Sequence, residues 1–279
     1  MPRRSRAVSG IVAGAALALL LGVGSGARMC AQQNPAEPAA NPAVTSSNPA
    51  EPPSRIDPKA QQVIDRVIRI LGGPAFLNMK RLTTRGRIYS IRDESTSGFA
   101  PFESWVEFPD KRRFSYGKKL PVILINNGDQ EWELDQYGQT DQLAEQVRRW
   151  KISNRYSLEN LLRLRIHEPG MLIQTGGVDF VDNVATQALD MVDAQATQLK
   201  LDLNRQTLLP VSIVYRVRDP KTGDWTEFAD VYSDYKDIQG IMTPMHIARF
   251  LDGERVSEIF RSYAHYDDEY PSTYFQPVR

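Results

Sequence analysis

The stretch LKLDLNRQTLLPVSIVYRVR, residues 199–218, decides the fold that the sequence predicts. Apolar and polar side chains alternate along it on both sides of a turn near Asn204-Arg205. A period of two is typical of β-strands whose two faces meet different surroundings. The alternating apolar residues are Leu199, Leu201, Leu203, Val211, Ile213, Tyr215 and Val217. The stretch therefore predicts two long neighbouring strands that share one apolar face.

The same pattern extends over residues 196–266, with turn candidates at residues 221–224, 239–240 and 252–253. Strands of roughly 10 residues span about 33 Å at the usual rise per residue. Such strands predict a broad, curved sheet or an open barrel. A wide sheet has more concave apolar surface than one short helix covers, so the spare surface is a natural pocket for an apolar ligand.

Further strands are predicted on both sides of a helical insert. Asn126-Asn127-Gly128-Asp129 carries the Asn-Gly pair of a tight hairpin, in which both central residues need positive φ. Asp182-Asn183 is a second turn candidate. The predicted strands are residues 81–91, 102–108, 111–117, 121–125, 131–134, 178–184 and 185–191.

Helices are predicted in two places. Asp57-Pro58 supplies a cap and a first-turn proline, and Gly72-Gly73 supplies a stop for a helix that packs on the sheet. The insert at residues 141–165 holds two helices, the second capped by Ser157. Its apolar positions are Leu143, Val147, Trp150, Leu158, Leu161, Leu162 and Leu164. The insert is either a permanent plug of the concave face or a mobile lid, and permanent packing is the simpler expectation.

Residues 1–31 have the pattern of an export signal: a positive start, an apolar run at residues 11–23, and small residues after it. That run is shorter than the roughly 20 residues that span a bilayer. Residues 32–55 are rich in Pro, Ala, Asn and Ser and form a disordered linker that cannot bury a core. Residues 56–279 form one folded domain. Because residues 1–31 predict export, the protein is expected in the periplasm.

The single cysteine, Cys30, excludes an internal disulfide and a Cys-based zinc site. It follows the signal, where a lipid anchor would be attached, but Met29 stands where a small residue is expected. A free thiol, or a residue lost with the signal, is the expectation that we prefer; lipid anchoring at Cys30 is the alternative.

The charge balance argues against a nucleic-acid partner. Setting aside the four arginines of residues 1–31 leaves 30 basic residues against 34 acidic. Charge is uneven, because residues 80–119 hold ten basic and five acidic residues. A cationic patch there could meet anionic head groups, although a solvated strand exterior explains it equally simply. The patch consists of Lys111, Arg112, Arg113, Lys118 and Lys119.

Motifs of catalysis are missing from the sequence: it contains no G-x-S-x-G, H-E-x-x-H or P-loop pattern. His265 with Asp267, Asp268 and Glu269 is the one titratable cluster, and consecutive acids on a strand point alternately apart. His167 and His246 lack a partner nearby in the sequence. We therefore expect neither an enzyme nor a bound metal or cofactor; a secreted hydrolase is the disfavoured alternative.

The order of parts resembles the LolA/LolB-like superfamily of periplasmic outer membrane lipoprotein-sorting and lipid-carrier proteins. The resemblance covers residues 56–279 and includes Tyr232-Ser233-Asp234-Tyr235, Ile238-Gln239-Gly240-Ile241 and Pro244. It implies a mainly β, α+β fold: a single unclosed, strongly curved antiparallel β-barrel whose helices cover an apolar concave face that shelters acyl chains. No position matches the family's functional arginine or its membrane-inserting loop.

Together these observations predict a carrier or chaperone that binds lipid or lipoprotein acyl chains for transfer toward the outer membrane, with an inner- or outer-membrane protein as a possible partner. The alternative is an envelope-stress sensor domain of the same fold that binds a partner protein. The predicted cavity residues are Trp105, Val122, Leu124, Leu199, Leu201, Leu203, Val211, Ile213 and Tyr215.

Overall fold

The alternating stretch forms β10 (Gln198–Asn204) and β11 (Pro210–Arg218), which pair antiparallel with Leu201 opposite Ile213. The computed structural model describes residues 53–219, 222–271 and 273–277. All of these residues belong to one compact unit. The predicted signal, residues 1–31, and most of the predicted linker, residues 32–55, lie outside the described residues.

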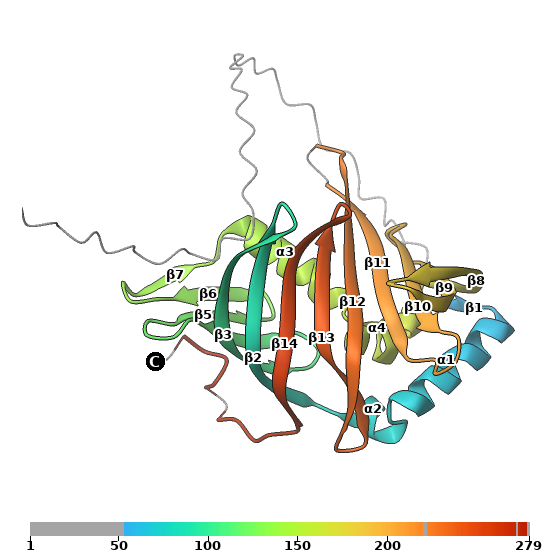
Figure 1. Cartoon of the computed structure of the whole chain (residues 1–279), viewed down its shortest axis with the longest axis horizontal. Coiled ribbons are helices and arrows are strands. Elements are labelled where there is room, and N and C mark those ends of the chain that lie inside the picture. Colours follow the sequence, from blue (N-terminus) through green and yellow to red (C-terminus); the bar gives the residue numbers. More distant parts are fainter. Residues whose placement is uncertain (1–52, 220–221, 272, 278–279) are drawn as a thin grey trace, which may run out of the picture. The chain divides into compact units, whose positions relative to one another are not determined.

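All strands of the described part join in one 14-stranded sheet, ordered β1-β8-β9-β10-β11-β12-β13-β14-β2-β3-β4-β5-β6-β7 (Figure 1). The remaining strands are β1 (Arg55–Ile56), β2 (Arg81–Arg92), β3 (Ser95–Glu107), β4 (Lys111–Tyr116), β5 (Val122–Asn127), β6 (Gln130–Leu134), β7 (Gln139–Asp141), β8 (Leu172–Val181), β9 (Val184–Val192), β12 (Trp225–Ile238), β13 (Ile241–Leu251) and β14 (Glu254–Tyr266). Because the order starts at β1 and ends at β7, the sheet does not close on itself. Pairing of β14 with β2 joins the two ends of the domain.

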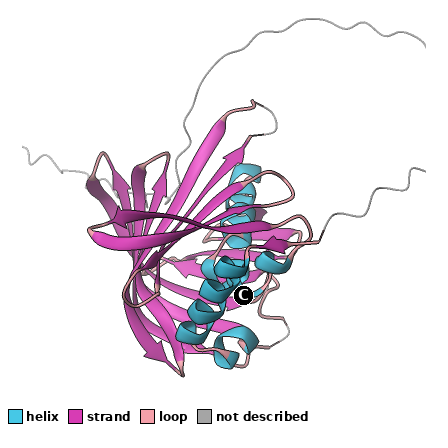
Figure 2. Cartoon of the chain, turned by 90° about the vertical axis from the view of Figure 1, so that its right-hand side faces the viewer, coloured by secondary structure: helices cyan, strands magenta, loops and turns pink. Residues whose placement is uncertain are grey.

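The helices lie on one side of the sheet, inside its curve (Figure 2). They are α1 (Pro58–Leu71), α2 (Pro74–Asn78), α3 (Ala144–Arg155) and α4 (Leu158–Arg163), followed by a 3₁₀ turn at Arg165–His167. The predicted mainly β fold, an unclosed curved sheet with helices covering its concave face, is confirmed. Within the described residues, no helix has the length and apolar character needed to cross a membrane.

The sheet is not purely antiparallel as predicted. Arg55 and Ile56 run parallel to Leu172 and Ile173 at one edge. A parallel pair needs a long connection, and here six of the fourteen strands and the four helices lie between β1 and β8 in the chain. Arg55, the last residue of the predicted linker, therefore belongs to the first strand.

The first helix forms as the sequence predicts. Asp57 Oδ1 accepts hydrogen bonds from the backbone N–H groups of Lys59, at 2.8 Å, and Ala60, at 3.2 Å. The buried side of α1 consists of Ala60, Ile64, Val67 and Leu71. At its end Gly72 has φ of 130°, and a Cβ there would lie 2.4 Å from the carbonyl oxygen of Gly240. The predicted stop thus also permits close approach to the turn after β12.

The Asn-Gly hairpin forms one residue later than predicted. Asn127 pairs with Gln130, so the two-residue loop is Gly128-Asp129, with a φ of 63° at Gly128. Asn127 therefore ends β5 and does not need positive φ. At Asp182 and Asn183, by contrast, both residues have positive φ, 47° and 63°, and the predicted turn is confirmed.

Two strands begin earlier than predicted. β3 starts at Ser95 rather than Phe102, and β8 starts at Leu172 rather than Val178. Their first residues include Gly98, Gly176 and Gly177, which break the apolar alternation on which the predictions depended. Backbone pairing with β2 and β9 holds these segments in the sheet.

Candidate functional site

Six of the predicted cavity residues form the buried core under the helices. They lie on β10 and β11, and their exposed fractions are 4% for Leu199, 0% for Leu201, 0% for Leu203, 7% for Val211, 0% for Ile213 and 3% for Tyr215. The ring of Tyr156, at the end of α3, lies 4.9 Å from the ring of Tyr215. This half of the concave face is therefore packed against the protein's own helices.

Val122 and Leu124, also predicted, lie in a more open region of the same face. In the β4–β5 register Val122 is opposite Tyr116 and Leu124 is opposite Phe114, so these four side chains share one side of the sheet. All four are half-buried, and Phe102 beside them is buried. We call Phe102, Phe114, Tyr116, Val122 and Leu124 the open wall.

Helix α3 lies beside one end of the open wall. The guanidinium of Arg112, two residues before Phe114 on the same side of β4, lies 5.6 Å from the centre of the Trp150 ring on α3. The opposite end, at Tyr116 and Val122, keeps partial access to solvent. Burial nevertheless raises the pKa of Tyr116 to about 12, which indicates an apolar setting.

Trp105, the remaining predicted residue, lies on the other face. It is opposite Arg113 and Thr83 in the neighbouring strands. Alternation along the strands puts these three residues on the face opposite that of Phe102 and Phe114. Its ring packs edge-on against Tyr274 with centroids 5.3 Å apart. The segment after β14 folds back there and forms a second small core of Ile125, Leu134 and Phe275, with Ile123, Trp132, Tyr270 and Tyr274 around it. Trp105 thus packs in this core and does not line the concave face.

The residues of the predicted cationic patch are divided between the two faces of the sheet. Lys111 forms an ion pair of 2.6 Å with Glu107, and Arg113 donates to the carbonyl oxygen of Tyr274 on the outer face. Arg112 points to the concave face, where it meets Trp150. Strand alternation therefore separates neighbours in the sequence, and the patch is not one continuous surface.

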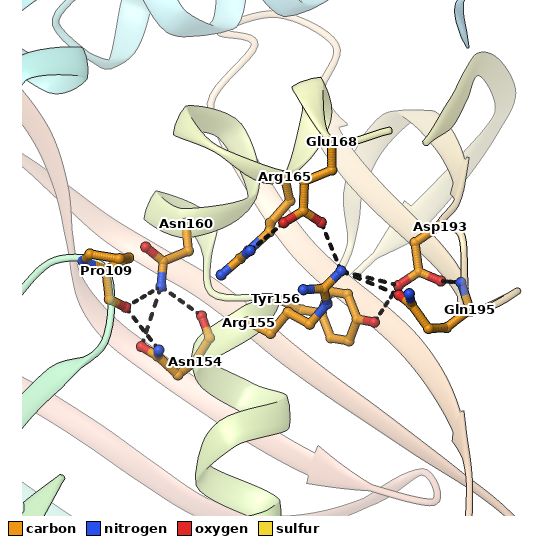
Figure 3. Close-up of polar contacts among 9 residues, drawn as sticks. All are labelled: Pro109, Asn154, Arg155, Tyr156, Asn160, Arg165, Glu168, Asp193 and Gln195. Atoms are coloured by element: carbon orange, nitrogen blue, oxygen red, sulfur yellow. Dashed lines mark hydrogen bonds and ion pairs between the residues drawn. The ribbon is translucent and has the colours of Figure 1, made fainter. Parts of the chain in front are cut away.

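The joint between α3 and α4 is fastened to the turn between β9 and β10 (Figure 3). Tyr156 donates its hydroxyl hydrogen to Asp193 Oδ2 at 2.6 Å, and Asp193 Oδ1 accepts from the backbone N–H groups of Gln195 and Thr197. Arg155 Nη2 lies 2.7 Å from Glu168 Oε2. These contacts hold one side of the helical insert against the sheet.

The other side of the insert is tied to the turn between β3 and β4 (Figure 3). Asn160, which is fully buried, donates through Nδ2 to the carbonyl oxygens of Pro109 and Asn154, each at 2.9 Å. Asn154 Nδ2 donates to the same Pro109 oxygen at 2.9 Å. An insert anchored at two separated turns behaves as a fixed plug of this half of the face rather than as a lid.

Replacing Asn160 by alanine is expected to lower the free energy of unfolding by about 1–3 kcal/mol, because the fully buried amide of Asn160 and its hydrogen bonds to the Pro109 and Asn154 carbonyls are lost. Hydrogen exchange at the α4 amides should quicken by a corresponding factor. Asn78→Ala, at the exposed end of α2, is the matched control and should change neither quantity measurably. Equal exchange in both variants would show that the insert is held elsewhere.

Two leucines predicted on the apolar side of the insert are exposed instead. Leu143 is 58% exposed and Leu164 is 40% exposed, while Leu158, Leu161 and Leu162 are buried. Leu143 precedes the first turn of α3, and Leu164 follows the last turn of α4. Both thus stand outside the helical periodicity from which their burial was predicted.

Charged groups lie beside the open wall on the concave face. Arg249 Nε is 3.4 Å from Asp230 Oδ1, and Arg261 donates to the carbonyl oxygen of Pro244 at 3.0 Å. Burial raises the pKa of the Asp230 carboxyl, an effect that the two arginines oppose. Arg112 Nη2 donates to Asn126 Oδ1 at 3.1 Å. The concave face therefore combines an apolar wall with charges of both signs, since Glu133 is opposite Leu124 and Glu131 is opposite Asn126 on the same side of the sheet.

Two hollows of about 250 Å³ each lie on the outer face. One, over β10–β13, contains Lys200 and Asp202, whose charges are matched: Asp202 accepts from Ser212 Oγ at 2.8 Å and lies 3.2 Å from Lys200 Nζ. The other lies beneath Tyr270 and contains the Arg81–Glu107–Lys111 ion pairs. Both are smaller than the roughly 300 Å³ at which small-molecule pockets begin. The concave face is the stronger candidate site.

The acidic cluster near the end of the domain is engaged in local contacts. His265 Nδ1 lies 2.8 Å from Asp268 Oδ1, and Asp267 Oδ1 accepts from the backbone N–H groups of Lys80 and Arg81. In the described residues no three His, Cys, Asp or Glu side chains converge as metal ligands. His246 Nδ1 lies 2.9 Å from Ser233 Oγ, with its ring stacked on Phe260.

No family model matches the sequence, and no curated protein is similar to it in sequence. Solved structures match it in fold. A DUF1329 family protein from Desulfovibrio piger has a TM-score of 0.53 and 13% identity, over 77% of this chain and 96% of that one. Because the identity is low, this likeness shows a shared fold.

Two further structures match with lower TM-scores. A domain named for outer membrane lipoprotein sorting, from Vibrio parahaemolyticus, has a TM-score of 0.46 and 9% identity, over 78% of this chain and 94% of that one. A LolA superfamily protein from Nitrosomonas europaea has a TM-score of 0.45 and 13% identity, over 78% of this chain and 97% of that one. Structures that carry the names of the predicted resemblance are therefore among those similar to this chain, at low sequence identity.

Proposed function

We propose that this protein is a periplasmic carrier that binds the acyl chain of a lipid or lipoprotein on the open wall, for transfer toward the outer membrane. The observation that carries the proposal is the apolar row of Phe114, Tyr116, Val122 and Leu124, which share one side of the sheet and keep partial access to solvent. Contiguous apolar surface on a concave face is typical of a binding site.

The energetics of an acyl chain fit such a surface. Each methylene group removed from water contributes about 0.8 kcal/mol, so ten methylenes contribute about 8 kcal/mol. Loss of translational and rotational freedom costs at least about 4 kcal/mol. The remainder, about 4 kcal/mol, corresponds to a Kd of about 1 mM for the chain alone, and a chain of about fifteen methylenes would reach about 1 μM on the same figures. Specific polar contacts are therefore unnecessary for binding, which agrees with the lack of a sequence motif.

Native mass spectrometry of the full chain purified from an envelope fraction tests the proposal directly. A lipid of defined mass bound to the protein is the expected result. A stoichiometric protein in place of lipid would favour the alternative function, a sensor domain that binds a partner protein. An empty protein that also takes up no acyl probe would contradict the carrier proposal.

Leu124→Asp is expected to weaken binding of a fluorescent acyl probe at least tenfold, because the variant removes apolar contact area and places a charge beside the chain. Leu124 is half-buried, so the variant should remain folded. Leu77→Asp, on α2 and 43% exposed, is the matched control and should leave the affinity unchanged. Equal probe affinities for both variants would exclude the open wall as the site.

A further inference from the structure

One edge of the sheet is open over most of its length in the described part of the chain. β8 lies at that end of the sheet, beside β1 (Figure 1). β1 pairs only with Leu172 and Ile173, while β8 continues to Val181. Among the described residues, no strand pairs with β8 beyond Ile173 on this side. Alternate residues of an edge strand direct N–H and C=O groups away from the sheet, so this stretch can accept a further strand.

The open stretch carries two exposed apolar side chains. Val178 is 60% exposed and Phe180 is 71% exposed. They are two residues apart, opposite Gln187 and Ala185 of β9, so both lie on the same side of β8. A strand that pairs with this edge would contact both side chains, which adds apolar burial to the backbone hydrogen bonds.

The features that usually keep edge strands from pairing with another chain are mostly missing from β8. Such strands are normally short, or carry lysine or proline. β7, at the other end of the sheet, has only three residues, Gln139–Asp141, all polar and exposed. β8 has ten residues and contains no lysine, arginine or proline. Its one protective feature is a bulge between Thr175 and Val178, which leaves residues 178–181 as the stretch available for pairing.

The charge of this edge favours a second copy of the chain as the partner. Asp179 is the one charged residue of β8. Its Oδ2 lies 3.1 Å from Lys200 Nζ, and its Oδ1 accepts a hydrogen bond from the backbone N–H of Phe180 at 2.8 Å. Asp182 stands in the turn, beyond the pairing stretch. The negative charge is therefore matched within the chain, so it does not select a cationic partner, whereas an identical strand matches the apolar pair.

We propose that two copies of this chain pair through residues 178–181 of β8, antiparallel about a two-fold axis, so that their sheets join into one. The axis makes the contact self-complementary, because Val178 and Phe180 of each copy pack against those of the other. A pairing stretch of four residues belongs to the small interfaces, so the dimer should dissociate on dilution. The proposal does not depend on the proposed function, since the open wall lies toward the other end of the sheet.

Sedimentation velocity of the full chain over a hundredfold range of concentration tests the dimer. The wild type should show a monomer–dimer equilibrium, and Phe180→Lys should raise the dimer Kd at least tenfold. Phe99→Lys, at a phenylalanine of β3 that is 66% exposed, is the matched control and should leave the Kd unchanged. A monomer at every concentration, or equal Kd values for the two variants, would overturn the proposal. Assemblies larger than two copies would also overturn it, because a two-fold contact closes at the dimer.

Crosslinking locates the contact independently of its strength. With the one natural cysteine removed by Cys30→Ser, the variant Val178→Cys should give a covalent dimer with a short bismaleimide, and Phe99→Cys should not. Both positions are exposed, so both variants should remain folded, which circular dichroism checks. A dimer in sedimentation without a crosslink at Val178, or with an equal crosslink at Phe99, would overturn the assignment of the interface to β8.

Discussion

Leu201→Asp is expected to unfold the protein rather than merely lower its lipid content. Leu201 is 0% exposed, between Leu189 and Ile213 in neighbouring strands. Truncating a buried leucine costs about 2–5 kcal/mol, and an unpaired buried carboxylate adds several more. The total is comparable with the whole stability of a domain, about 5–15 kcal/mol. Urea denaturation followed by circular dichroism should show no folded baseline, or an unfolding midpoint at a much lower urea concentration than that of the wild type.

The control for Leu201→Asp is Leu120→Asp, the same change at a side chain that is 65% exposed. Substitutions on exposed surface usually change stability by less than about 0.5 kcal/mol. A cooperative transition with a near-normal midpoint in Leu201→Asp would mean that a cavity, and not packed core, lies at β10. In that case the six buried residues of β10 and β11 would return as candidate ligand contacts.

The β10–β11 stretch shows what alternation can and cannot predict. A period of two correctly placed Leu201, Ile213 and Tyr215 on one apolar face, because each strand's own sequence determines which side chains share a face. Whether that face is covered depends on the helical insert, which lies elsewhere in the chain. Sequence alone therefore could not separate packed core at β10 from the open wall at Val122 and Leu124.

Trp105 shows how the face of the strand on which a residue lies decides a site prediction. Phe102 and Ser104 on the same strand face the helices. Side chains alternate along a strand, so Trp105 faces outward. The sequence marks both Phe102 and Trp105 as apolar strand residues, and only their partners distinguish the faces. Trp105 is covered by the segment that contains Tyr274 and Phe275, and nothing in the sequence of that segment indicates which strands it covers.

Gly86→Ala is expected to destabilise the junction between the two ends of the domain. Gly86 lies on β2 opposite Arg261 of β14, where the register shifts between Arg261 and Tyr263. A Cβ at Gly86 would lie 1.9 Å from the carbonyl oxygen of Phe260 and 2.9 Å from its carbonyl carbon. Those are backbone atoms, so a side-chain rotation cannot relieve the clash.

Relief of that clash requires β14 and β2 to separate, which strains the pairing that joins the two ends of the domain. Overpacking typically costs about 1–3 kcal/mol, and a clash against backbone belongs at or above the upper end of that range. The urea midpoint should fall accordingly. Gly98→Ala is the matched control, a strand glycine on β3 whose added Cβ would meet nothing within 4 Å, and its stability should stay within about 1 kcal/mol of wild type. Equal midpoints for the two variants would mean that β14 stands further from β2 at Gly86 than the structure shows.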